Sequence, residues 1–284
     1  MDEFDRLAAD TTSSATSLTG LVVQLLRDAR RDGAAAVAGA ARGVCAAQPS
    51  MGAFWNLAAA ALHDEPRFEA LAERARRSPA AAARIAGDLL RDHAQRIVTC
   101  SRSAMVEAAI RALRGAGISV RCAESRPGLE GRALAAALAA DAIAVELVAD
   151  AAIASDFRTG DVVIVGADAV AADWFLNKTG TGQLCAAALL AGVPAYVVAG
   201  REKFVGPSLA AALRLREDAA AAVWADPPVG VRVANPLFER VPLDRVAGVI
   251  SDTGLLAGGM IAAACDAVVP DAAARVLLDL SKDW

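Results

Sequence analysis

The chain has 284 residues, of which 22% are charged and 56% are hydrophobic, and its formal net charge is −4 at pH 7. These values fit a soluble globular protein with one large domain or two modest ones. The small acidic charge excludes a broad cationic surface for nucleic acid or for an acidic membrane. No uninterrupted apolar run reaches the roughly 18 residues that a transmembrane helix needs.

The composition is strongly skewed toward alanine and arginine. Alanine accounts for 72 residues, and 26 of the 29 basic residues are arginine. Lysine occurs at three positions, among them Lys178 and Lys203, and asparagine occurs only at Asn56, Asn177 and Asn235. A lysine or asparagine that persists against this bias is more informative about function than usual, because a lysine ammonium is not interchangeable with an arginine guanidinium.

Cysteine and histidine are too scattered for the common metal and nucleophile sites. The five cysteines have no C-x-x-C or metal-ligand spacing, and only His63 and His93 could serve a zinc site or a Ser-His-Asp triad. We therefore expect no metal and no cofactor. The first ten residues carry four acids and lack the basic start of a secretory signal. We expect a cytoplasmic protein with no membrane or nucleic-acid partner.

Residues 1–95 are predicted to form a helical bundle or cap. Apolar residues recur at helical spacing, as in Leu18, Val22 and Leu26, and no segment alternates as a half-buried strand does. Helix breaks are predicted at 32–33, 48–50 and 78–79, where Gly, Ser or Pro interrupts the pattern.

From residue 96 onward, short apolar runs alternate with helical segments, which predicts a mainly parallel sheet with helices on both faces. We place the domain boundary near residue 95, giving domains 1–95 and 96–284. A long excursion is predicted around Pro227 and Pro228. The predicted strands are 96–99, 118–122, 144–148, 161–166 and 194–198, followed by one more strand and closing helices in 246–284.

Polar residues follow each strand, where ligands of such sheets bind. The first strand runs into Thr99–Ser103, whose hydroxyls and N–H groups at a helix N-terminus, with Arg102, predict an anion site. The alternative is a serine N-cap beside a solvated arginine.

The second predicted strand is followed by two arginines, Arg126 and Arg132, on either side of a Pro/Gly turn. They could hold a phosphate through paired guanidinium hydrogen bonds. They could equally form a structural network with Glu124 and Glu130.

The strand at 161–166 is followed by Gly166-Ala167-Asp168, whose carboxylate is well placed for proton transfer, although a turn-forming aspartate is common. Further on, 177–182 reads Asn-Lys-Thr-Gly-Thr-Gly before a helix and predicts a small phosphate cradle. It lacks the GxxxxGK[ST] spacing of a nucleotide-binding P-loop, and no GxGxxG follows the first strand. The combination favours a small phosphorylated ligand.

These motifs, in this order, resemble the superfamily that contains the α, β and δ regulatory subunits of translation initiation factor 2B, methylthioribose-1-phosphate isomerase and ribose-1,5-bisphosphate isomerase. The resemblance spans most of the chain and implies a helical N-terminal domain, a Rossmann-like C-terminal domain and a homodimer formed largely through the latter. The segments that carry it are 48–51 with Asn56, 99–103, 124–132, 166–168, 177–181, 202–204, 235–238 and 249–252.

The resemblance also implies where the catalytic groups lie. The isomerases use a cysteine from a Thr-His-Cys segment together with the aspartate of Gly-Ala-Asp. Here the same register places Cys100 at the histidine position and Ser101 at the catalytic cysteine position, while Asp168 is kept. The nearest counterpart of an N-terminal Arg-Gly phosphate motif, residues 11–16, has no arginine.

Two functions follow from this reading. In the first, the chain binds a phosphorylated sugar and isomerises an aldose to a ketose, with Asp168 moving a proton and Ser101 or Cys100 as the second acid or base. In the second, it is a non-catalytic regulatory protein that senses a sugar phosphate or nucleotide, like the initiation-factor subunits. The residues predicted to bind the ligand are Arg102, Ser103, Arg126, Arg132, Asn177, Lys178, Gly180 and Lys203.

Overall fold

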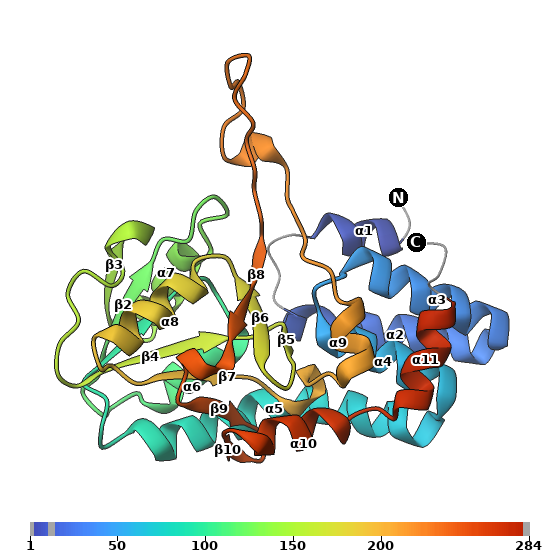
Figure 1. The fold of residues 1–284 in the computed structure, drawn as a ribbon. Coiled ribbons are helices and arrows are strands. Elements are labelled where there is room, and N and C mark those ends of the chain that lie inside the picture. Colours follow the sequence, from blue (N-terminus) through green and yellow to red (C-terminus); the bar gives the residue numbers. More distant parts are fainter. Residues whose placement is uncertain (1–2, 11–14, 281–284) are drawn as a thin grey trace.

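The structure is a computed structural model that describes residues 3–10 and 15–280. It has two lobes that lie side by side, one made of helices and the other built around a mainly parallel sheet (Figure 1). This confirms the predicted fold class. The N-terminal helices are α1 (Glu3–Ala9), α2 (Ala15–Asp32), α3 (Ala34–Ala47), α4 (Gly52–His63) and α5 (Glu65–Leu90).

Helix α4 lies at the centre of the helical lobe. Every residue from Gly52 to Ala61 is buried, as expected for a helix that is apolar on all sides. Helix α2 is amphipathic and buries Leu18, Val22 and Leu26, which recur every four residues on one face. The alanines of α4 let the surrounding helices approach closely.

The predicted helix break at 78–79 is wrong, because α5 continues through Pro79. Proline has no N–H to bond the carbonyl four residues earlier, which here belongs to Ala75. The Ser78 hydroxyl donates to that carbonyl over 3.4 Å, so the acceptor retains a partner. The breaks predicted at 32–33 and 48–50 coincide with the ends of α2 and α3.

The main sheet has the strand order β10-β9-β7-β4-β1-β2-β3, and every neighbouring pair except β9 and β10 is parallel. The chain builds outward from β1 in one direction and then from β4 in the other, so the order reverses between these two strands. Ligands of such sheets bind at this point. The strands are β1 (Arg96–Thr99), β2 (Ser119–Ala123), β3 (Ala144–Val148), β4 (Asp161–Gly166), β7 (Ala195–Val198), β9 (Gly248–Ser251) and β10 (Gly254–Leu256).

Strand β4 is buried along its whole length and divides two cores. Val162 and Ile164 pack on the face covered by α5, α6 (Ala104–Ala112) and α7 (Glu130–Ala140). Val163 and Val165 pack on the face covered by α8 (Thr181–Leu190) and α10 (Gly259–Asp266). The continuous apolar run in this segment is therefore explained by burial on both faces.

A second, antiparallel sheet was not predicted. It contains β5 (Ala169–Val170), β6 (Trp174–Lys178) and β8 (Phe238–Pro242) in that order. Its central strand ends at Asn177 and Lys178, and β8 places Glu239 and Phe238 directly opposite them. Two candidate residues are thus held on a strand rather than a loop.

Later helices return to the helical lobe. Leu209 of α9 (Pro207–Ala212) and Leu277 of α11 (Asp271–Asp279) belong to the same core as α4. The helical lobe therefore includes residues far beyond position 95. Along the ranges 3–10 and 15–280, no helix has the length and apolar character needed to cross a membrane.

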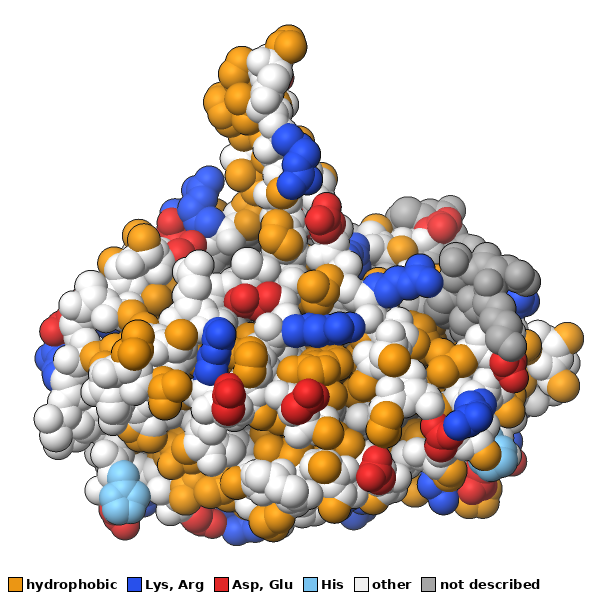
Figure 2. Space-filling model, in the orientation of Figure 1, with side chains coloured by type: hydrophobic (Ala, Val, Ile, Leu, Met, Phe, Trp, Pro, Cys, Tyr) orange, Lys and Arg blue, Asp and Glu red, His pale blue; other side chains and the backbone are white. Residues whose placement is uncertain are grey.

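The predicted excursion around Pro227 and Pro228 is a long arm that projects from the body between α9 and β8 (Figure 1). Its base is a narrow ladder in which Asp218 N–H donates to the Asn235 carbonyl and Leu237 N–H donates to the Arg216 carbonyl. Apolar side chains gather on its outer part (Figure 2). The exposed apolar residues of this part are Val223, Trp224, Val229 and Val231.

Candidate functional site

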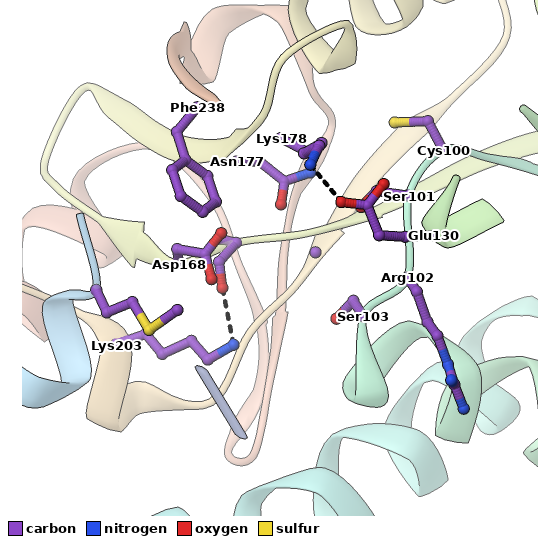
Figure 3. A pocket seen from close by; sticks show the side chains of 13 residues that line it. Cys100, Ser101, Arg102, Ser103, Glu130, Asp168, Asn177, Lys178, Lys203 and Phe238 are labelled. Carbon is purple, nitrogen blue, oxygen red and sulfur yellow. Dashed lines mark hydrogen bonds and ion pairs between the residues drawn. The ribbon is translucent and has the colours of Figure 1, made fainter. Parts of the chain in front are cut away.

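A small cavity lies where β1 and β4 end, at the reversal of the strand order, and β6 and β8 of the second sheet close one side (Figure 3). Its volume is about 50 Å³, enough for a few water molecules. The lining residues are Met51, Cys100, Ser101, Arg102, Ser103, Glu130, Gly166, Ala167, Asp168, Asn177, Lys178, Lys203 and Phe238.

The segment after β1 forms one wall. Ser101 adopts a left-handed backbone conformation with φ of 61°, and its N–H donates to the Ser125 hydroxyl over 2.6 Å. The Cys100 thiol lies 3.6 Å from the Thr181 hydroxyl, and burial raises the pKa of Cys100 to about 11. The cysteine is therefore a protonated thiol at neutral pH. Ser103 is the N-cap of α6 and accepts from Val106 N–H over 3.5 Å.

Arg102 points away from the cavity (Figure 3). Its Nε donates to a carboxylate oxygen of Glu107 over 3.0 Å, and its side chain is 45% exposed. Of the two roles considered for the 99–103 segment, this arrangement matches the serine N-cap beside a solvent-facing arginine.

The segment after β2 contributes an acidic residue, Glu130, to the cavity, and its two arginines lie elsewhere. Arg126 is exposed, and Arg132 forms an ion pair of 2.6 Å with Glu124; neither lines the cavity. Glu130 does line it, and forms an ion pair with the ammonium of Lys178. The other carboxylate oxygen of Glu130 is buried and has no hydrogen-bond partner in the part of the chain described.

Asp168 follows β4 and is held by its backbone. Its N–H donates to the Leu176 carbonyl, and its carbonyl accepts from Gly52 N–H, both over 2.8 Å, so it is fixed to β6 and to the start of α4. Burial raises the pKa of its carboxyl group, while the ammonium groups of Lys203 and Lys178 lower it. The net shift is upward, which favours a carboxyl group that can accept and return a proton.

The predicted phosphate cradle is filled by a side chain of the protein itself. Gly180 has a φ of 102° and precedes α8, and the N–H groups of Gly180 and Gly182 both donate to Glu239, over 2.7 and 3.0 Å. A carboxylate thus occupies the helix N-terminus at which an anion binds favourably. Asn177 donates to the Thr181 hydroxyl over 2.9 Å.

Lys203 enters from the opposite side. Its ammonium donates to the Ala167 carbonyl over 2.8 Å, and the side chain is almost completely buried. Asn56 of α4 holds this segment by donating to the carbonyls of Glu202 and Phe204, over 2.9 and 2.7 Å. Asn56 therefore links the two lobes through hydrogen bonds and does not line the cavity.

The charges that face the cavity balance. Glu130 and Asp168 oppose Lys178 and Lys203, and the guanidinium of Arg102 is directed outward. Three of the five predicted phosphate-binding cations, Arg102, Arg132 and Lys178, are already paired with glutamates. Along 3–10 and 15–280, no group of three or more His, Cys, Asp or Glu residues could hold a metal ion.

Sequence reasoning did not assign Glu130, Glu239, Met51 or Phe238 to the site. The sequence indicates Glu130 only as a partner of arginine, and Phe238 only as part of a family signature. A glutamate inside a segment already suspected of binding phosphate was the available signal for Glu130. Residues 11–14 of the 11–16 segment lie outside the described residues.

Comparison with known proteins agrees with this fold. The model of the initiation factor 2 subunit family matches residues 55–258. The chain is 31% identical over 217 residues to a translation initiation factor eIF-2B subunit 2-like protein of Pyrococcus furiosus, covering 73% of this chain and 76% of that one. A crystal structure of translation initiation factor eIF-2B from Pyrococcus horikoshii OT3 superposes with a TM-score of 0.76 and 25% identity, over 90% of this chain and 98% of that chain.

Isomerases are also similar over a shorter stretch. Ribose 1,5-bisphosphate isomerase of Methanocaldococcus jannaschii is 33% identical over 146 residues, which cover 50% of this chain and 47% of that enzyme. The chain thus spans about half the length of this relative. The family match covers well over half of the chain and includes the segments that build the cavity from Cys100 to Phe238. The chain belongs to the initiation factor 2 subunit family.

Proposed function

We propose that the chain binds a small sugar phosphate in the cavity beside β1 and β4 and isomerises it between aldose and ketose forms. The observation that carries this proposal is Asp168, a carboxyl group at a strand end whose pKa is raised by burial and which faces the cavity between two lysines. Related proteins named ribose 1,5-bisphosphate isomerase and methylthioribose-1-phosphate isomerase support it.

In this reaction the bond between C1 and the ring oxygen of the sugar breaks, hydrogen moves from C2 to C1, the C2 hydroxyl becomes a carbonyl and the released ring oxygen takes up the hydroxyl proton, so there is no net oxidation. Asp168 would take the C2 proton, which converts the sugar to an enediol-type intermediate, and would then return the proton to C1. Ser101 or Cys100 would exchange the hydroxyl proton. Because the pKa of Cys100 is raised to about 11, its thiol suits a proton donor better than a nucleophile.

The cavity walls would exclude water from the intermediate. Asn177 would orient a hydroxyl group and Lys203 would hold the phosphate, since Lys203 has no carboxylate among the partners described for its ammonium. Closure of the two lobes around the bound sugar phosphate would precede chemistry.

A second function is favoured by the charge pairing. Lys178 is bound to Glu130, and the N-terminus of α8 is bound to Glu239; a phosphate would therefore have to displace protein carboxylates. A protein that senses a sugar phosphate or nucleotide without converting it could have this arrangement. Relatives named for initiation factor 2B support this reading.

The experiment that separates the two functions is direct. Purified protein is incubated with ribose-1,5-bisphosphate, methylthioribose-1-phosphate and related sugars, the ketose product is followed by NMR, and binding is measured by calorimetry. Turnover that is lost in Asp168→Asn with binding retained supports isomerisation. Saturable binding without turnover supports the sensor. Loss of activity in Ser101→Ala but not in Cys100→Ala would identify Ser101 as the second acid or base, and the reverse would identify Cys100.

We also propose that the chain forms a homodimer or a larger homo-oligomer, with the arm as part of the interface. Trp224 is 50% exposed and Val229 is fully exposed, and large apolar groups gathered on a projection favour burial against a partner. Light scattering after size exclusion gives the mass. A Trp224→Ser variant that dissociates while its circular dichroism is unchanged supports the arm as interface, and a monomeric native chain refutes it.

A further inference from the structure

A second cavity lies between the first half of α5 and the turn that joins α10 to α11. Its volume is about 420 Å³, within the range of sites that hold small organic ligands. None of its lining residues lines the candidate isomerase site. It includes three arginines, Arg67 and Arg74 from α5 and Arg201 from the segment after β7.

The three arginines differ in how well carboxylates and other acceptors pair their guanidinium groups. Arg74 forms an ion pair of 3.0 Å with Asp252, and Arg67 forms a looser one of 3.7 Å with Asp64. The Nε of Arg201 is shielded from solvent and has no hydrogen-bond partner in the ranges 3–10 and 15–280. A shielded donor without an acceptor is unfavourable and is rare in folded proteins, so Arg201 is the least compensated of the three guanidinium groups.

A backbone hydrogen bond fixes Arg201 beside Arg74. Arg201 N–H donates to one oxygen of Asp252 over 2.8 Å, while the other oxygen of Asp252 binds Arg74. This carboxylate therefore joins the sheet lobe to α5. Apolar residues, among them Leu71 and Val268, form the rest of the lining.

We propose that this cavity binds a small organic oxyanion, a carboxylate or phosphate monoester that carries a compact apolar group. Planar guanidinium groups bind both oxyanions through paired hydrogen bonds, and Leu71 and Val268 offer surface to the apolar part. The anion would bridge α5 and the segment that leads to Lys203. The site is independent of the isomerase proposal because it shares no lining residue with that cavity.

Calorimetric titration with benzoate and phenyl phosphate, with neutral benzamide as the uncharged probe, tests the proposal. We expect saturable binding of at least one anion and none of benzamide, and the stronger of the two anions identifies the oxyanion class. Arg201→Gln should weaken binding about tenfold or more, the loss of one charge-assisted hydrogen bond.

Arg67→Gln provides a second variant, because Arg67 is half-exposed on a helix surface and its loss does not threaten folding. The control is Arg84→Gln, which removes an exposed arginine that pairs with Asp88 on the same helix. Weaker binding in both test variants with no change in the control supports the site. Equal binding in all variants, or no saturable binding of either anion to the native chain, overturns it.

Discussion

Replacing Glu130 with glutamine is expected to strengthen the binding of phosphate in the candidate site. Glu130 and Lys178 form an ion pair whose side chains are only 10% and 9% exposed, and the second carboxylate oxygen of Glu130 has no described partner. Glutamine keeps the size of the side chain and removes its charge. The ammonium of Lys178 is then available to an incoming phosphate.

The size of the effect follows from two contributions of the same sign. A carboxylate and a phosphate charge about 6 Å apart repel each other by about 2.8 kcal/mol at an effective dielectric constant of about 20. A hydrogen bond from a freed ammonium to phosphate stabilises the complex by about 1.5–3 kcal/mol. Water competes for both groups, and Lys178 loses the partner that orients it. We therefore expect a net gain of about 2 kcal/mol, or roughly 30-fold in Kd.

Calorimetry with inorganic phosphate and with methylthioribose-1-phosphate measures this gain directly. Thermal unfolding provides a second readout, because Lys178 without its carboxylate destabilises the unliganded fold and bound phosphate should restore part of that stability. Glu73→Gln is the matched control, since it removes an exposed carboxylate of α5 that pairs with Arg76 and Arg77. Equal affinities in the native chain and Glu130→Gln, or the same gain in the control, would refute the reasoning.

Three further predictions concern stability. Burial raises the pKa of Glu202 from its usual 4.5 to about 7, so the folded chain holds a proton that the unfolded chain releases between these values. The stability that this protonated group contributes is fully present below about pH 4.5 and is lost as pH rises through about 7, by about 1.4 kcal/mol per pKa unit. Denaturant titrations at a series of pH values should show this fall in the free energy of unfolding. The Glu202→Gln variant should show a flatter pH dependence. Gly131→Ala should destabilise the fold by about 1–3 kcal/mol, because a Cβ there would lie 1.7 Å from the Ala123 carbonyl oxygen. In contrast, the Cβ of Gly39→Ala in α3 would meet nothing within 4 Å, and this change should stabilise the fold by about 0.5–1 kcal/mol. Phe54→Ala should cost about 3–5 kcal/mol in chemical unfolding, since Phe54 is completely buried, and a loss below about 1 kcal/mol would contradict the packing of α4.

The local pattern of apolar and polar residues was sufficient to predict much of the fold. The apolar run from Val162 to Val165 predicts a strand buried on both faces, and the alternation with helices predicts parallel neighbours. These inferences depend on side-chain period and segment length, which the residues carry regardless of their surroundings. The β5–β6–β8 sheet was missed because β5 has two residues and β8 lies about 60 positions after β6, so no local pattern pairs them.

The location of the site was also accessible from the residues alone. Parallel strands end at one edge of the sheet, so Ser101 and Asp168 were expected to lie near one another once the strands were assigned. The rarity of lysine in this chain pointed to Lys178 and Lys203, and both line the cavity. Asn56 was equally rare and lies elsewhere, because its amide is used to tie α4 to the Lys203 segment.

By itself, then, the sequence determined the order of the parallel strands from β1 to β7 and the residues that follow each of them. Only the tertiary structure decided how the charges are used. Arg132 could have turned toward a phosphate or toward Glu124, and residues 180–182 could have held a ligand or Glu239. The choice at 180–182 depends on Glu239, which lies 59 residues beyond Gly180 and accepts from the N–H groups of Gly180 and Gly182 at distances of 2.7 and 3.0 Å. Sequence spacing contains no information about those distances.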